Sequence, residues 1–298
     1  MAGMGLSEGM QSVSKDLLTN PAALRSCVLE ALYLDCGERS FLDAENGGGA
    51  TSSTVMLLLG EQPVEPAAPA VAGHPRREVA VILNKRSRRV KQAGDLCCPG
   101  GTVEPRLDPY LARLLLLPGT PLARWPHWPE LRRRKCRKKA RLLALLLATG
   151  LRESWEEMRL NPFSIALLGA LPPQRLLLFP RIIHPLVGWV KWQQRLVPSW
   201  EVEKIVPIPL RSLLNPAHYA CYRLHVPSRL EQRFNQSTRD MPCFLYQDGS
   251  QTEMLWGATY KIVMNFMERV FRFRPPDLRA LPMVPGILDE SYIFGRED

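Results

Sequence analysis

The chain has 298 residues, a formal net charge of +10 and 46% hydrophobic residues, enough apolar material for a folded core, which excludes wholesale disorder. Eight basic residues and no acid fall in one run, residues 132–141, so the rest of the chain carries a net charge of only +2. The high pI therefore describes one segment, and by itself it does not indicate a nucleic-acid-binding surface.

The first 50 residues are predicted to form a helical extension, with apolar residues at helical spacing and a helix start at Asn20-Pro21. Strands are expected at 54–59 and 78–84, separated by a flexible connection at 62–74 that is rich in Pro, Ala and Gly. The string Cys97-Cys98-Pro99-Gly100-Gly101 then predicts a turn, because two glycines free the backbone where a Cβ would obstruct it.

A long helix is predicted over about 140–160, ended by Asn161-Pro162, and a closing helix over about 255–271. Short strands are expected between them, at 165–169, 181–190 and 204–210. Strands before and after a central helix indicate an α/β or α+β protein.

The domain organisation follows from these elements. We predict an N-terminal extension over 1–50, a catalytic domain over 51–272 with an insertion at about 113–139, and a C-terminal tail over 273–298.

Cysteine usage and apolar runs indicate where such a protein would reside. Seven cysteines without a Cys-x-x-Cys pair are typical of reduced thiols, so a cytoplasmic protein is expected, or a mitochondrial or peroxisomal one if the source is eukaryotic. No signal peptide is expected. The apolar run at 142–148 is far shorter than the roughly 20 residues of a membrane span and predicts a buried helix segment.

Three glutamates gather on the predicted central helix. In the string Leu-Arg-Glu-Ser-Trp-Glu-Glu at 151–157, helical geometry places Glu153, Glu156 and Glu157 on one side. Like charges at this spacing repel, and a bound divalent cation would reverse that interaction. Magnesium prefers oxygen ligands and shares its shell with phosphates, so the pattern indicates pyrophosphate chemistry. The alternative is a solvated acidic face, which is common on exposed helices.

With Gly100-Gly101 upstream, this helix resembles the Nudix box, a glycine, an acid and then Arg-Glu-apolar-x-Glu-Glu-x-Gly, which forms a metal-binding loop–helix–loop. The resemblance implies the Nudix fold, a mixed β-sheet flanked by helices. It also implies that Glu153 and Glu157 are the main ligands of Mg²⁺ (or Mn²⁺), with Glu156 supporting them in metal binding and catalysis. Arg152 would orient the glutamates.

A further metal contact or a general base is expected from Glu201 or Glu203, in the segment after the predicted strand at 181–190. For either residue the alternative is a solvated surface position.

Three departures from the box stand out. Arg159 replaces the final glycine, so the turn after the helix is expected at Asn161-Pro162 instead. Ser154 fills the apolar position. A long insertion separates the helix from the box's first acid, for which Asp108 and Glu104 are the two candidates.

The segment 84–101 narrows the resemblance to one branch of the family. Its Arg-Ser pair followed by Lys-Gln-x-Gly-Asp-Leu-Cys-x-Pro-Gly-Gly is similar to the signature that precedes the box in coenzyme A diphosphatases. Segments 168–173, 201–216 and 255–259 extend the likeness. The implied substrate is coenzyme A or acyl-CoA, cleaved to 3′,5′-ADP and (acyl-)4′-phosphopantetheine.

The same segment supplies the expected substrate-binding residues. Arginine's planar fork matches phosphate oxygens, and glycines let the backbone approach a ligand closely. The residues expected to bind substrate are Arg86, Arg89, Lys91, Gly100 and Gly101. The alternative is a basic surface strand followed by a structural turn.

Two other functions stay open. One is a Nudix hydrolase of another nucleoside diphosphate derivative or of capped RNA. The other is a catalytically weak Nudix scaffold that binds nucleotide or RNA through the insertion, which combines the basic run with Trp125 and Trp128. The insertion itself could be a lid over substrate phosphates, a patch for nucleic acid or an anionic membrane, or a solvated loop.

Overall fold

The computed structural model describes residues 17–33, 51–63, 77–133, 137–175, 181–191, 195–225 and 238–287. Most of the predicted connection at 62–74 lies outside these ranges. So do residues 1–16 and 34–50 of the predicted extension, and 288–298 of the predicted tail.

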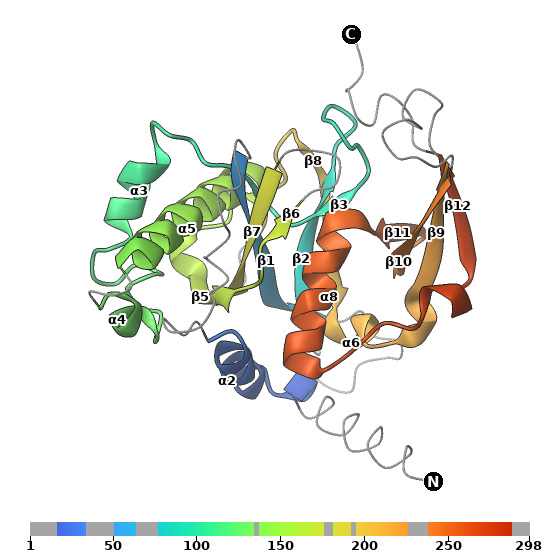
Figure 1. Ribbon diagram of the computed structural model, residues 1–298, viewed down its shortest axis with the longest axis horizontal. Helices are drawn as coiled ribbons and strands as arrows, with labels where there is room; N and C mark the ends of the chain where they lie inside the picture. Colours follow the sequence, from blue (N-terminus) through green and yellow to red (C-terminus); the bar gives the residue numbers. More distant parts are fainter. Residues whose placement is uncertain are drawn as a thin grey trace.

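A mixed eight-stranded sheet forms the centre of the fold (Figure 1). Its main path runs β3-β2-β1-β7-β5, with β4 beside β1, β6 beside β7 and β8 beside β2. β1 and β7 are parallel, and the other pairs in this sheet are antiparallel. The strands are β1 (Thr51–Pro63), β2 (Arg77–Arg86), β3 (Leu96–Cys97), β4 (Gly100–Thr102), β5 (Ile165–Ala170), β6 (Gln174–Arg175), β7 (Arg181–Val190) and β8 (Val202–Pro209).

Both faces of this sheet are covered by helices. On β1, Met56 and Leu58 pack on the side of α5 (Arg137–Met158), whereas Leu57 and Leu59 pack on the side of α2 (Pro21–Ala31) and α8 (Gly257–Phe271). Strands buried on both faces are continuously apolar, which is why the central strands were recognisable in the sequence. The helix start at Asn20 is confirmed, because its side chain accepts a hydrogen bond from Ala23 N.

A second sheet, which the sequence analysis did not predict, lies beside α8 (Figure 1). Its order is β11-β10-β9-β12, and β12 pairs in parallel with β9, so part of the predicted tail lies within this sheet. The strands are β9 (Tyr219–His225), β10 (Thr238–Asp248), β11 (Gln251–Leu255) and β12 (Met283–Ile287). Short helical turns complete the described fold: α6 (Leu210–Leu213), η2 (Pro162–Ser164), η3 (Pro216–His218) and η4 (Leu278–Ala280). Mixed sheets flanked by helices confirm the predicted α+β class.

The described part of the insertion is folded onto the domain. It begins at the last residues of α3 (Asp108–Leu114), contains α4 (Trp128–Leu131) and leads into the start of α5. Trp125 and Trp128 are buried in the core on the α5 side, so neither ring is available to stack on a base. Tyr33, which follows α2, donates a hydrogen bond to Glu130. A nucleic-acid contact at the insertion would therefore depend on its basic residues rather than on its tryptophans.

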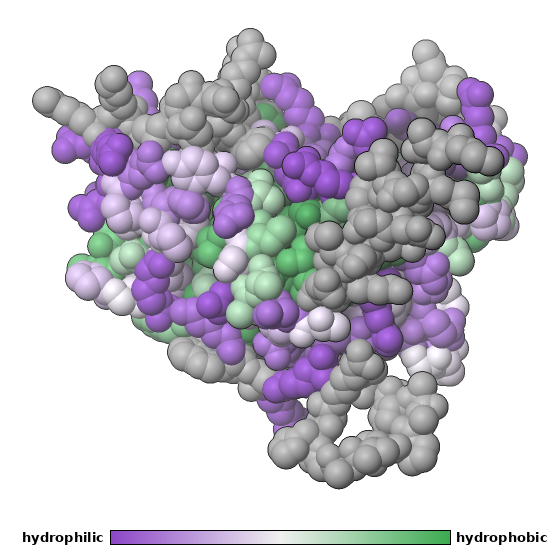
Figure 2. All heavy atoms as spheres, turned by 90° about the horizontal axis from the view of Figure 1, so that it is seen from below, coloured by the Kyte–Doolittle hydropathy of each residue, from purple (hydrophilic) through white to green (hydrophobic). Residues whose placement is uncertain are grey.

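The face seen from below is hydrophilic over most of its described surface, around a central apolar area (Figure 2). None of the described helices is both long and apolar enough to cross a membrane.

Candidate active site

The two glycines of β4 lie against two carboxylates of α5. Gly100 N donates to Glu157 Oε1 at 3.4 Å, and Asn84 Nδ2 of β2 donates to Glu157 Oε2 at 2.6 Å. At Gly101 a Cβ would overlap the Glu153 carboxylate. A Cβ at Gly100, where φ is +156°, would overlap the backbone of β1. The Gly-Gly pair therefore allows one strand to approach both glutamates closely.

Burial gives these two carboxylates unusual protonation behaviour. Desolvation raises the pKa of Glu157 to about 7, although hydrogen bonds from Gly100 and Asn84 oppose the shift, and the charge of Glu153 adds to it. Desolvation also raises the pKa of Glu153, against the opposing charge of Arg152. Burial therefore disfavours the charged form of both carboxylates, and a bound divalent cation would offset this cost.

This donor set fits a hard divalent ion. Glu153 and Glu157 offer oxygen atoms beside a glycine backbone, and magnesium is commonly bound by one or two carboxylates together with water and substrate phosphates. No group of three His, Cys, Asp or Glu side chains with metal-ligand geometry occurs in the part of the chain that the structure describes.

The third glutamate has a different setting. The Glu156 side chain is half-exposed, and Arg152 Nη1 donates to its Oε2 at 2.8 Å. Arg152 Nη2 also lies 3.1 Å from Glu153 Oε1. Glu156 therefore lies at the solvent-exposed edge of the site beside Arg152, whereas Glu153 is more buried. The proposed metal and catalytic role of Glu156 stays a prediction.

Arg152 is held in place by a carboxylate from the other end of the insertion. Asp108 is fully buried, and its Oδ1 accepts from Arg152 Nε at 2.8 Å. The other oxygen of Asp108, Oδ2, accepts from Thr149 Oγ1 and from Glu104 N, each at 2.7 Å. The Glu104 side chain is exposed. Of the two candidate acids, Asp108 therefore contacts the arginine of the box.

The expected turn at Asn161-Pro162 is wrong, because the chain turns at Arg159 itself. This residue has φ of +54°, the left-handed conformation for which glycine is favoured after a helix. Its guanidinium lies 5.6 Å from the centroid of the Trp155 ring. The substitution of Ser154 for an apolar residue is accommodated as well, since its buried hydroxyl donates to Gly150 O at 2.7 Å.

The conformation of Arg159 leads to a stability prediction. Arg159→Gly should leave the free energy of unfolding unchanged or raise it by up to about 1 kcal/mol, because glycine adopts positive φ without steric strain. Arg159→Val should lower it by about 1–2 kcal/mol, since a β-branched residue fits this conformation poorly. Urea unfolding of the three proteins measures both effects, and equal stabilities for the glycine and valine variants would contradict the conformation described.

The contact between Gly101 and Glu153 leads to a second prediction. Gly101→Ala should reduce metal-dependent turnover by about a hundredfold, because the new Cβ displaces the Glu153 carboxylate. The change in unfolding free energy should be much smaller than that of a core deletion, since the side chain at the edge of the site can rotate. Gly94→Ala is a control for the steric contact, because a Cβ there meets no atom within 4 Å. Its φ of +83° adds backbone strain, which affects stability rather than the position of Glu153. Equal turnover by both variants would contradict the steric argument.

A cavity of about 250 Å³ adjoins the glycines. Three of the predicted substrate-binding residues, Arg86, Gly100 and Gly101, line it. Arg89 and Lys91 are exposed in the turn between β2 and β3 and are not among the lining residues. Arg86 is close enough to the glutamates for its charge to lower the pKa of Glu157.

The two candidate general bases, Glu201 and Glu203, contact residues other than Glu153 and Glu157. Glu203 forms an ion pair with Lys85 at 3.2 Å, and Lys85 also binds the buried Glu253 of β11 at 3.1 Å. This network joins the two sheets. The Glu201 side chain is exposed, while its backbone carbonyl accepts from Ser87 N at 2.8 Å. Its catalytic role stays a prediction.

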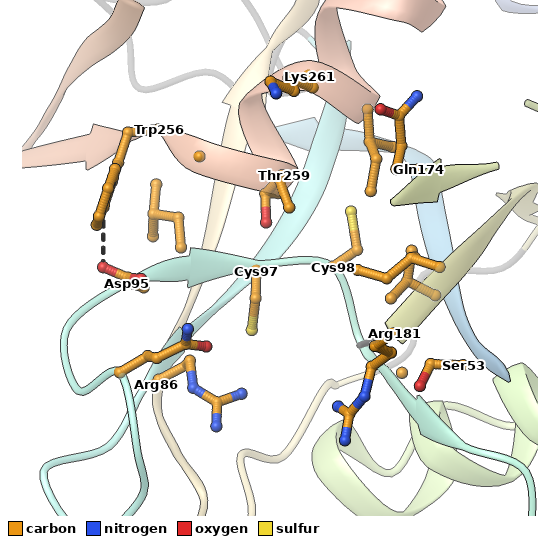
Figure 3. A pocket seen from close by; sticks show the side chains of 18 of the residues that line it. Ser53, Arg86, Asp95, Cys97, Cys98, Gln174, Arg181, Trp256, Thr259 and Lys261 are labelled. Atoms are coloured by element: carbon orange, nitrogen blue, oxygen red, sulfur yellow. Dashed lines mark hydrogen bonds between the residues drawn. The ribbon is translucent and has the colours of Figure 1, made fainter. Parts of the chain in front are cut away.

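The structure adds residues to the site that sequence reasoning missed. Arg175 of β6, Arg181 of β7, Arg239 of β10, and Trp256 and Lys261 at the start of α8 all line the cavity. In Figure 3, Arg86 and Arg181 extend to the side of the β3–β4 segment to which Cys97 points. These residues come from distant parts of the chain, and only the parallel pairing of β7 with β1 brings Arg181 to this edge.

Comparison with known proteins gives weak likenesses. No family model and no curated protein matches the chain. A C. elegans Ap4A hydrolase binary complex matches with TM-score 0.31 and 11% identity, over 55% of this chain and 84% of that chain. The NUDIX domain of Shewanella oneidensis NrtR complexed with ADP ribose has TM-score 0.31 and 14% identity, over 58% and 80%. A NUDIX hydrolase from Alicyclobacillus acidocaldarius has TM-score 0.32 and 12% identity, over 56% and 82%. Scores this low do not assign the chain to a family.

Proposed function

We propose that this protein is a Nudix-type hydrolase that cleaves a phosphoanhydride with the help of a divalent metal ion. The observation that carries the proposal is the glycine strand lying against Glu153 and Glu157, with Arg152 fixed behind them by Asp108. The loop–helix–loop predicted from the Nudix box has this arrangement of parts. The long insertion does not separate them, because Asp108 and α5 meet again across it.

The described residues have distinct roles in this proposal. Gly100 and Gly101 let a diphosphate approach the glutamates without steric hindrance, and Arg86 and Arg181 donate hydrogen bonds to its oxygens. Arg152 holds Glu153 in position. When bound between the two glutamates, Mg²⁺ or Mn²⁺ would neutralise charge on the diphosphate and lower the pKa of an attacking water. Glu201 is the proposed proton acceptor.

Within this class, we propose that the substrate is coenzyme A or an acyl-CoA. The support is the Arg-Ser to Gly-Gly segment at 84–101, which supplies both the Arg86 guanidinium and the glycines of the cavity. The products would be 3′,5′-ADP and (acyl-)4′-phosphopantetheine.

Substrate assays test both steps of the proposal. With Mg²⁺ present, mass spectrometry should detect 3′,5′-ADP released from coenzyme A, and EDTA should prevent its release. Inert coenzyme A with cleavage of ADP-ribose or a capped RNA would refute the substrate and retain the chemistry. Binding of nucleotide or RNA without cleavage of any anhydride would refute the enzyme and favour a scaffold.

A further inference from the structure

The surface of α3 carries a concentration of exposed apolar side chains. Of the twelve large apolar side chains that are exposed among the described residues, five fall within residues 107–117. Exposed apolar residues scattered singly are ordinary, whereas a cluster on one short segment marks an interaction surface. The five are Leu107, Tyr110, Leu114, Leu116 and Leu117.

Four of these side chains form a stripe on one helical face. α3 continues as helical turns to residue 117, since Leu115 N donates to Leu111 O at 3.0 Å and Leu117 N donates to Leu114 O at 3.1 Å. Positions 107, 110, 114 and 117 follow the spacing at which side chains share one face of a helix. The opposite face, which includes Leu115, is buried in the core beside α5. The stripe therefore lies outside the core that the described residues form.

Basic side chains border the stripe. Arg106 and Arg113 are exposed, and the Arg113 guanidinium lies 5.6 Å from the centroid of the Tyr110 ring. The start of α3 contacts the middle of α5 through Asp108 and Arg152, so α3 runs back toward the first turns of α5 (Figure 1). Those turns carry three further exposed cations, Arg137, Lys138 and Arg141.

Acidic side chains are scarce on this surface. Among the described residues between 104 and 141, the only acids are Glu104, Asp108 and Glu130. Asp108 is fully buried, and Glu130 accepts a hydrogen bond from Tyr33. An exposed apolar stripe bordered by cations is complementary to an anionic lipid surface, because acyl chains accept the leucines and headgroup phosphates attract the cations.

We propose that α3 and the start of α5 form a peripheral binding site for anionic phospholipid bilayers. The leucine stripe enters the boundary between headgroups and acyl chains, and Arg113, Arg137 and Arg141 bind headgroup phosphates. Single-stranded RNA fits this surface less well, because Trp125 and Trp128 are buried and leucine offers no ring on which a base can stack. Neither the cavity nor the α5 glutamates take part in this contact, which goes beyond the proposed function and does not depend on it.

Co-sedimentation with vesicles tests the apolar stripe. The wild-type protein should bind vesicles of equal parts phosphatidylglycerol and phosphatidylcholine about tenfold more tightly than vesicles of phosphatidylcholine alone, and added NaCl should weaken that binding. Leu114→Ser/Leu117→Ser should weaken it about tenfold, because the variant loses apolar area that enters the bilayer. Met283→Ser/Ile287→Ser is the matched control, since it removes two exposed apolar side chains of β12, at the other end of the molecule (Figure 1).

The cations are tested in the same assay. Arg137→Gln/Arg141→Gln should weaken binding to the phosphatidylglycerol vesicles about tenfold, because both side chains lie at the proposed surface. Arg25→Gln/Arg279→Gln removes the same charge from exposed positions on α2 and η4 and should have little effect. Circular dichroism establishes that each variant is folded.

Three outcomes would overturn the membrane site. The first is equal affinity for the two kinds of vesicle, or vesicle binding that Leu114→Ser/Leu117→Ser leaves intact. The second is a dimer, detected by light scattering, that the same variant dissociates in a protein without affinity for vesicles, which would assign the stripe to a second copy of this chain. The third is binding of single-stranded RNA, but not of vesicles, that Arg137→Gln/Arg141→Gln weakens. None of these measurements uses an anhydride substrate, so failure of the proposed hydrolysis would leave them unaffected.

Discussion

Glu157→Gln is expected to reduce metal-dependent anhydride hydrolysis by about a thousandfold while leaving the protein as stable as the wild type or more so. Glutamine keeps one oxygen that accepts from Gly100. Its amide nitrogen replaces the oxygen that accepts from Asn84 Nδ2, and it can donate to Asn84 Oδ1, which has no other partner within the described residues, once the Asn84 amide turns over. The substitution removes a carboxylate whose desolvation raises its pKa and whose charge repels that of Glu153. Loss of turnover with retained stability identifies a group that is present for function rather than for folding.

The measurement is kcat with Mg²⁺ together with the free energy of urea unfolding without metal. Glu30→Gln provides a matched control, because it makes the same change on the exposed face of α2. Turnover close to that of the wild type in Glu157→Gln would eliminate this residue as a metal ligand. A large loss of stability would instead show that the carboxylate has a structural role.

Asp108→Asn is expected to lower the free energy of unfolding by about 3–5 kcal/mol, the largest effect on stability that the site predicts. The Arg152 side chain is only 11% exposed and the Asp108 side chain is 0% exposed, so the variant leaves a buried guanidinium without its main counter-charge. Turnover should fall with it, since Arg152 contacts both Glu153 and Glu156. Urea unfolding measures the loss, and Glu104→Gln, at the exposed rival acid, should have little effect.

The pH dependence gives an independent check on this ion pair. Burial raises the pKa of Asp108, but hydrogen bonds from Arg152, Glu104 N and Thr149 outweigh it, and the net pKa is lowered. A lowered folded-state pKa stabilises the protein above the carboxyl's unfolded pKa, and this contribution is lost as the pH falls through the folded value. The difference in stability between wild type and Asp108→Asn should therefore shrink in acid. A difference that stays constant below pH 4 would contradict the assignment.

Local sequence patterns predicted individual strands and helices, because each of these is formed by one continuous segment of the chain. The strand at 181–190 is found as β7 with the same bounds, and the helix expected at about 140–160 is α5. The second sheet was missed because β10 and β12 lack the continuous buried run that marks the central strands: β10 begins Thr-Arg-Asp, and β12 is exposed at every second residue. Only the pairing of these strands with β9 shows that they belong to a sheet.

In the candidate site, too, local patterns indicated some residues and missed others. Residue types and helical spacing indicated Glu153, Glu157 and the glycines, because their chemistry is local to two short segments. The choice between Asp108 and Glu104 depended on which acid returns to α5 across the insertion, and no local pattern contains that information. Lys261 and Arg181 carried no signal, since a single basic residue is common on any surface.

Binding of Mn²⁺, measured by electron paramagnetic resonance on the protein after treatment with EDTA, tests the central claim most directly. The wild-type protein should bind Mn²⁺, excess Mg²⁺ should displace it, and the double variant Glu153→Gln/Glu157→Gln should bind neither ion. Equal Mn²⁺ binding by the wild type and the double variant would contradict the claim that the glycine strand and the α5 glutamates form the metal site.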